Sequence, residues 1–136
     1  MFQNGRNKLA EAVAIHTEVA WVTMYKNQPS QGEVDLELRS QGFIPHCFAE
    51  AKFWRDTDCP GERSNQLLEA DVVYVRDFFR VDMDDEQLKQ LALIAHHCYR
   101  SFDLALRCVK LLEERQAVGV GSKQRYLDAL PPESRG

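Results

Sequence analysis

The chain has 136 residues, with 17 Lys and Arg against 21 Asp and Glu, so its formal net charge is −4. Apolar residues make up 44% and charged residues 28%, close to an average globular domain, which excludes a disordered or collagen-like chain. Because nucleic-acid binding needs a basic stripe and none is visible, the acidic balance argues against a nucleic-acid partner. One domain is the default at this length.

The sequence shows no sign of export or of a membrane span. No apolar h-region follows Arg6, and no apolar run approaches the roughly 20 residues of a spanning helix. We therefore expect a cytoplasmic protein. Its four cysteines have no C-x-x-C spacing and are expected to be reduced thiols: Cys47, Cys59, Cys98 and Cys108.

The first half of the chain reads as strand, helix, strand, strand. Residues 12–22 are apolar on both faces and rich in β-branched side chains, which predicts a buried strand of a parallel sheet. Ser30 and Glu33 have the spacing of a capping box, and Gly42 suits the left-handed end of a helix, so 31–41 is predicted to be helical.

Two further strands are predicted after this helix. They cover 43–54 and 71–78, and the Pro, Gly, Ser and Asn residues within 55–69 indicate a loop between them. The two strands are expected to form an antiparallel hairpin. This order of elements indicates the end of an α/β sheet rather than a whole one.

The second half is predicted to be helical. Asp84 and Gln87 can cap a helix reciprocally, and Ser101 favours a break that would divide the segment 84–115 in two, although one long helix is also possible. A last turn is expected at 126–130. An apolar stripe with steps of three and four runs along the helical segment: Leu88, Leu91, Ala95, Cys98, Phe102, Ala105, Val109 and Leu112.

His16 and Glu18 are the first candidate site residues. They lie two apart in a predicted strand, so both side chains point to the same face. Ligands of open α/β sheets bind outside the carboxyl ends of the strands, and Glu18 lies towards that end. Glu18 could hold or deprotonate a substrate hydroxyl, or it could simply pair with a lysine or arginine.

Tyr25, Asn27 and Gln28 follow the same strand. They could line a pocket at its carboxyl end, or they could only form a turn.

Two other patterns carry less weight. His96, His97 and Cys98 are adjacent, and neighbouring helical residues point about 100° apart, so the three cannot converge on one metal ion. Cys98 instead fits the apolar stripe as a buried thiol. Gly119 and Gly121 form a G-x-G that follows a helix rather than a strand, which favours a helix cap over a phosphate loop.

The first half of the chain contains an ordered series of motifs: His16-Thr17-Glu18-Val19, Tyr25, Gln28-Pro29, Leu38-Arg39 and Gly42-Phe43. This series resembles the later part of the FkbM-like SAM-dependent methyltransferases. The run at 67–78 also resembles the last strand of that family, and the segment 91–106 resembles a helical extension of bacterial members.

The resemblance implies the C-terminal part of a Rossmann-like (class I) methyltransferase sheet followed by a helical extension. The three strands would be the fifth, the sixth and the antiparallel seventh of the sheet. The organisation is then 1–80 in the α/β domain, 81–130 in the extension and 131–136 as a polar tail. It also implies methyl transfer from S-adenosyl-L-methionine to a hydroxyl oxygen of a small-molecule or glycan acceptor. Glu18 and His16 would act on the hydroxyl, and Tyr25, Asn27 and Gln28 would bind the acceptor.

The family's glycine-rich cofactor turn and its acidic residue after the second strand do not occur in the sequence. We therefore expect a C-terminal portion that is inactive alone. The strand at 12–22 would have an open apolar edge, which predicts pairing with a second copy or with a missing N-terminal half, or poor solubility. The alternative is a non-catalytic interaction module that offers the helical stripe to a partner.

Overall fold

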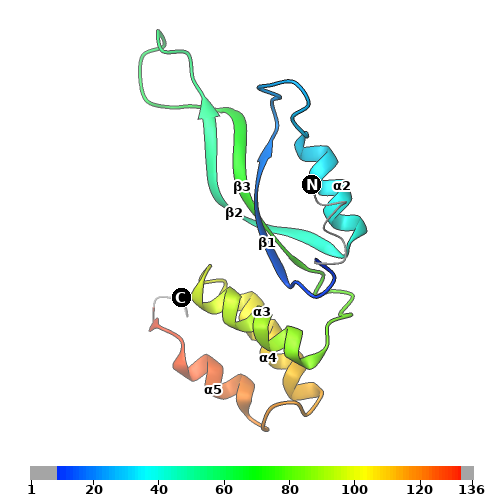
Figure 1. Cartoon of the computed structure of the whole chain (residues 1–136). Coiled ribbons are helices and arrows are strands. Elements are labelled where there is room, and N and C mark those ends of the chain that lie inside the picture. The colour runs from blue at the N-terminus through cyan, green and yellow to red at the C-terminus, as the bar shows by residue number, and fades with distance from the viewer. Residues whose placement is uncertain (1–8, 133–136) are drawn as a thin grey trace. The chain divides into compact units, whose positions relative to one another are not determined.

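The computed structural model describes residues 9–132, which form three strands and four helices. The chain divides into a sheet unit, up to Arg76, and a helical unit, from Asp77. The sheet unit holds β1 (Ala14–Ala20), α2 (Gln31–Ser40), β2 (Phe43–Trp54) and β3 (Gln66–Arg76). The helical unit holds α3 (Asp85–His97), α4 (Phe102–Glu114) and α5 (Ser122–Ala129). Figure 1 shows both units.

The strand order in the sheet is β1-β3-β2, and β3 runs antiparallel to both of its neighbours. β1 and β2 therefore run in the same direction, on either side of β3. The predicted β2–β3 hairpin is confirmed. The prediction of a buried, parallel first strand is wrong, because β1 pairs with β3 in the antiparallel sense and exposes His16 and Glu18.

The core of the sheet unit lies between α2 and one face of the sheet (Figure 1). Val19 of β1, Val72 of β3 and Phe43 of β2 pack with Leu38 of α2, and all four are buried. The hydroxyl of Tyr74 donates to Asp35 Oδ1 of the helix at 2.8 Å. Burial and the neighbouring Asp35 raise the pKa of Tyr74, so the phenol stays protonated and the bond persists at neutral pH.

Arg76 ties the end of β3 to two other segments. Its guanidinium donates to the carbonyl of Gln41, at the end of α2, at 2.6 Å, and to that of Ala12, before β1, at 2.7 Å. It also lies 4.0 Å from the ring centroid of Phe43. Gly42 sits directly beside it at φ +91°, the left-handed conformation predicted for the end of this helix.

The helical unit begins with the predicted capping box: Asp84 accepts from the Gln87 N–H, and Gln87 accepts from the Asp84 N–H. The predicted break is also confirmed, because Ser101 is the N-cap of a separate helix α4. α3 packs on α4, and most of the apolar stripe is buried: Leu88, Leu91, Ala95, Ala105 and Leu112. This burial leaves little of the stripe for a partner, which weighs against the interaction module.

Other expectations need correction. β3 begins at Gln66, inside the predicted loop, and ends at Arg76 rather than 78. The final turn is a full helix, α5. Cys98 is exposed at the C-cap of α3, whereas Cys108 is buried; all four cysteines are free. Most of the predicted tail, 133–136, lies outside the described residues.

Candidate functional site

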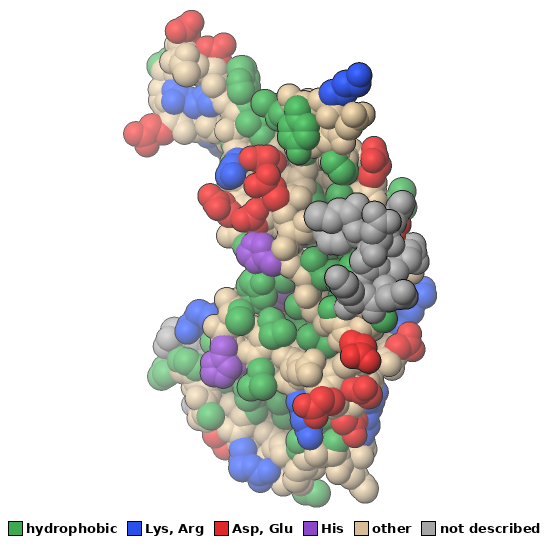
Figure 2. Space-filling view, in the orientation of Figure 1, with side chains coloured by type: hydrophobic (Ala, Val, Ile, Leu, Met, Phe, Trp, Pro, Cys, Tyr) green, Lys and Arg blue, Asp and Glu red, His purple; other side chains and the backbone are tan. Residues whose placement is uncertain are grey.

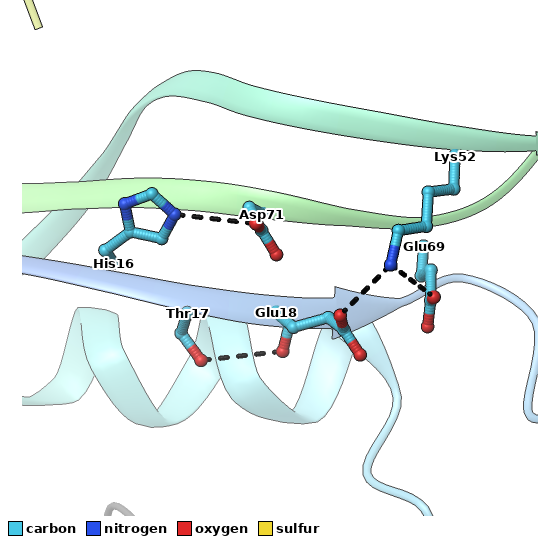
Figure 3. A network of polar contacts seen from close by, with 6 residues as sticks. All are labelled: His16, Thr17, Glu18, Lys52, Glu69 and Asp71. Atoms are coloured by element: carbon cyan, nitrogen blue, oxygen red, sulfur yellow. Dashed lines mark hydrogen bonds and ion pairs between the residues drawn. The ribbon is translucent and has the colours of Figure 1, made fainter.

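His16 and Glu18 take part in a polar cluster on the face of the sheet opposite α2 (Figure 3). His16 Nε2 lies 3.6 Å from Asp71 Oδ2 of β3. Glu18 Oε2 lies 3.6 Å from Lys52 Nζ of β2, and the same ammonium group lies 3.3 Å from Glu69 Oε1. The two candidates therefore each have a partner on another strand.

The strand register explains these partners. Glu18 is opposite Asp71, and Lys52 is opposite Glu69, so the polar side chains alternate along their strands and share one face. The residue directly opposite His16 is Val73, and Asp71 lies two residues away from Val73 on β3. The His16 side chain therefore contacts Asp71 diagonally, as long side chains do across antiparallel strands. Lys52 extends over β3 towards the far strand. Figure 2 shows acidic side chains gathered over this part of the sheet unit.

Lys52 is the cation at the centre of the cluster. The hydrogen bond that Lys52 donates to Glu69, with the negative charges of Glu69 and Glu18, raises the pKa of Lys52 above its ordinary value. The lysine is thus charged at neutral pH and holds both carboxylates. The side chains of Lys52 and Glu18 are each about half exposed. Because exposed ion pairs contribute little to stability, this pair orients the two side chains more than it stabilises the fold.

A cavity of about 150 Å³ opens at the carboxyl end of β1. Glu18, Tyr25 and Gln28 all contribute to its wall, together with residues of β1 and α2 and the intervening Pro29. His16 and Asn27 do not line it. The structure thus brings three of the five candidate residues to one hollow and leaves the other two outside.

The segment after β1 is shaped by local bonds. The Gln28 N–H donates to the Tyr25 carbonyl at 3.3 Å, and Asn27, at φ +66°, occupies the left-handed position of that turn. The side-chain oxygen of Gln28, Oε1, accepts a hydrogen bond from the Met24 N–H at 2.7 Å. The side-chain nitrogen of Gln28 therefore points away from Met24. Asn27 therefore has a turn-forming role, while the Gln28 side chain has a fixed position at the cavity.

Sequence reasoning missed Lys52, Glu69 and Asp71 as members of the cluster. The available signal was the period of two between Glu69 and Asp71, which places both on one face of a strand. The predicted strand begins at 71 and leaves Glu69 in the predicted loop, which hides this pattern. The alternative in which Glu18 pairs with a lysine is what the structure shows.

The helical unit contains the remaining candidates. His96 and His97 have ring centroids 4.7 Å apart, but no three His, Cys, Asp or Glu side chains within 9–132 are grouped as metal ligands. Near the G-x-G, the Glu113 carboxylate accepts from the N–H groups of Gly121 at 2.5 Å and Lys123 at 3.2 Å. The start of α5 is therefore already capped by a carboxylate from α4, and the predicted capping role of the glycines agrees with this.

Comparisons of the chain with family models, with curated proteins and with solved structures each gave no match.

Within the part of the chain that the structure describes, no helix has the length and apolar character needed to cross a membrane.

Proposed function

We propose that this chain supplies the acceptor side of a SAM-dependent O-methyltransferase that resembles the FkbM-like family. The observation that carries the proposal is the meeting of Glu18, Tyr25 and Gln28 at one cavity. These residues come from two motifs of the resemblance, the strand end with Glu18 and the Tyr-x-x-Gln-Pro element with Tyr25 and Gln28. A hydroxyl-bearing acceptor is the substrate class that a carboxylate, a phenol and an amide would bind.

The topology of the sheet unit also supports this assignment. β1 and β2 run in the same direction and are joined through α2, while β3 runs antiparallel to both. The resemblance expects this of a fifth, a sixth and an antiparallel seventh strand. The cavity lies at the carboxyl end of β1, where open α/β sheets bind their ligands.

The described residues do not fit the cofactor. The cavity of about 150 Å³ is smaller than the roughly 300–1,000 Å³ of typical small-molecule sites. The G-x-G follows α4 rather than a strand, and the N–H groups at the start of α5 already bind Glu113. We infer that SAM is held by residues outside 9–132, on the same polypeptide or on a partner, and we assign no step of cofactor binding to this part.

The chemistry assigned to this chain is therefore limited to the acceptor. In its ion pair with Lys52 the Glu18 carboxylate lies on the face of the sheet opposite α2, so to reach an acceptor in the cavity it would turn around the open edge of β1. There it would accept the hydrogen bond of the acceptor hydroxyl and take its proton as the oxygen is methylated. The Gln28 amide and the Tyr25 phenol would hold the acceptor in place, which supplies the proximity that methyl transfer requires.

The test uses the protein purified from its own cells through a tag on this chain, so that bound partners are retained. Methyl transfer from tritiated SAM to a panel of glycosides is measured. We expect the purified complex to methylate a hydroxyl acceptor, and Glu18→Gln to lower the rate by about 100-fold or more.

Glu33→Gln is the matched control, because Glu33 is an exposed glutamate of α2 outside the cavity. We expect it to leave the rate unchanged. In calorimetry, the chain alone should show no saturable heat with S-adenosylhomocysteine. Absence of transfer in the wild-type complex, or equal rates for both variants, would overturn the proposed function; binding by the chain alone would overturn the assignment of SAM to other residues.

A further inference from the structure

The helical unit contains a second hollow that the proposed function does not use. It is a groove of about 560 Å³, and Figure 2 shows hydrophobic side chains around a histidine on this unit. Every wall residue belongs to α3, α4 or α5 or directly follows α5: Lys89, Ala92, Leu93, His96, His97, Val109, Leu112, Tyr126, Ala129 and Leu130. Its volume lies within the range of about 300–1,000 Å³ of small-molecule sites.

The wall of the groove is mostly apolar, and the polar groups that residues 9–132 contribute to it are cationic or neutral, with no carboxylate among them. Leu93, which is 60% exposed, shows that apolar surface is open to an occupant. Lys89, Leu93 and His96 follow one another at steps of four and three on α3, so they share one face of the helix. Lys89 and His96 are two turns apart, about 10 Å along the axis.

The polar groups of the groove differ in whether they already have a hydrogen-bond partner. His96 Nδ1 lies 2.9 Å from the Tyr126 hydroxyl, so these two groups satisfy each other. The His96 ring is also held against the Phe102 ring, at a centroid distance of 5.2 Å. Lys89 is exposed and makes no hydrogen bond or ion pair within residues 9–132. Of the two carboxylates one turn before it on α3, Asp85 and Glu86, the first is paired with Arg115 at 3.3 Å, so the Lys89 ammonium group is available to an anion.

We propose that this groove binds a medium-chain fatty carboxylate, with its chain along Leu93, Val109 and Leu112 and its carboxylate at Lys89. Charge complementarity selects this occupant. An apolar wall favours a hydrocarbon chain, and a lysine without an acidic neighbour in the wall favours one anionic head. A neutral chain of equal length would lose the contact with Lys89. This inference does not depend on the methyltransferase proposal.

The test is a titration of the full chain with laurate below its micelle concentration, followed by calorimetry and by amide chemical shifts. We expect saturable binding at one site, with shifts centred on α3 to α5. Lys89→Met should weaken binding about tenfold. Lys123→Met is the matched control, because Lys123 is an exposed lysine of the same unit outside the groove, and it should bind as the wild type does.

Two further probes keep the inference falsifiable. Leu93→Glu places a carboxylate in the groove at a position exposed enough to preserve folding, and it should abolish laurate binding. Dodecanol should bind at least several-fold more weakly than laurate. The inference is overturned if laurate does not saturate, if Lys89→Met and dodecanol leave the affinity unchanged, or if the shifts lie in the sheet unit. It is also overturned if a second copy fills the groove, which a wild-type dimer that Leu93→Glu dissociates would reveal.

Discussion

Gly42 is a position where the backbone and a neighbouring side chain both exclude a Cβ atom. Its φ is +91°, and an added Cβ would lie 2.9 Å from Arg76 Nη1. An arginine end can usually move aside. Here the guanidinium is fixed by bonds to the Gln41 and Ala12 carbonyls and by the Phe43 ring, so moving it would break several contacts at once.

Gly42→Ala should therefore lower the free energy of unfolding by about 2 kcal/mol or more in urea titrations followed by tryptophan fluorescence. Gly61→Ala is the control, since Gly61 has φ +93° but nothing within 4 Å of the added Cβ. It should cost about 1 kcal/mol, from the left-handed backbone alone. Equal losses would mean that the Arg76 network does not contribute.

Cys108 should make stability depend on pH in the alkaline range. Burial raises the pKa of this thiol from 9.0 to about 11. Between these values the unfolded chain loses the proton and the folded chain keeps it, so the free energy of unfolding falls as pH rises and is unaffected below the window. The decrease attributable to Cys108 should approach roughly 2–3 kcal/mol.

The measurement is urea unfolding under reducing conditions from about pH 8 to pH 11, for the wild type and for Cys108→Ala. The variant should lose less stability over this range, whatever its stability at neutral pH. Tyr74 and Tyr126 also have raised pKa values, but they are present in both proteins. Parallel curves for the two proteins would contradict the assignment.

At the scale of elements, the N-caps of α3 and α4 can be compared, because one makes a side-chain capping bond and the other does not. Asp84 caps α3 through a 2.8 Å bond to the Gln87 N–H, whereas Ser101 caps α4 with no side-chain capping bond. Asp84→Ala should cost about 1 kcal/mol and Ser101→Ala clearly less, in urea unfolding followed by circular dichroism. A larger loss at Ser101 would show that the capping bond at Asp84 does not determine helix stability.

The elements predicted correctly are those with local signals. The bounds of β2, the capping box at Asp84 and the break at Ser101 follow from neighbouring residues. The direction of β1 could not be predicted, because an apolar run does not specify whether its partner strand is parallel. The early start of β3 was missed because Gln66 follows Ser64 and Asn65, and only pairing with the distant β2 makes that segment extended.

The candidate site was predictable to a similar degree. The carboxyl end of β1 indicated Glu18, Tyr25 and Gln28, and these line the cavity. The partners of His16 and Glu18 depend on strand register, which joins positions far apart in the sequence. The groove of the helical unit depends on how α5 packs near α3, as seen in the bond between His96 and Tyr126, and the predicted final turn was too short to suggest it.

At the scale of the whole molecule, the sheet has two edge strands. Within 9–132, β1 pairs only with β3 apart from a single bridge between Ala20 and Ser30. An unpaired edge invites a further strand, so we expect the purified chain to associate. Light scattering coupled to size-exclusion chromatography should give a mass above 15.7 kDa at micromolar concentration. A monomer that persists across dilution would contradict this prediction.

A Pro placed in the middle of β1 provides the corresponding control. Glu18→Pro removes a backbone donor on the side of β1 away from β3, because the bonds of Trp21 to Leu68 and of Arg76 to Val13 turn the alternate residues of β1 outward. It should lower the mass to that of a monomer while the circular dichroism spectrum stays unchanged. Phe48→Lys charges the other edge strand, at a side chain that is 59% exposed, and should leave the mass unchanged. Loss of association in Phe48→Lys rather than at β1 would place the contact on β2.

The two edges are not equivalent, and this limits what the protein can build. β2 is interrupted by three register shifts, between Pro45 and Cys47, Phe48 and Glu50, and Lys52 and Phe53, whereas β1 pairs with β3 without interruption. Bulges twist an edge away from regular pairing. A sheet with one regular edge can add one neighbour and then has no second edge of the same kind, so we expect growth to terminate at a closed pair instead of propagating into a fibre.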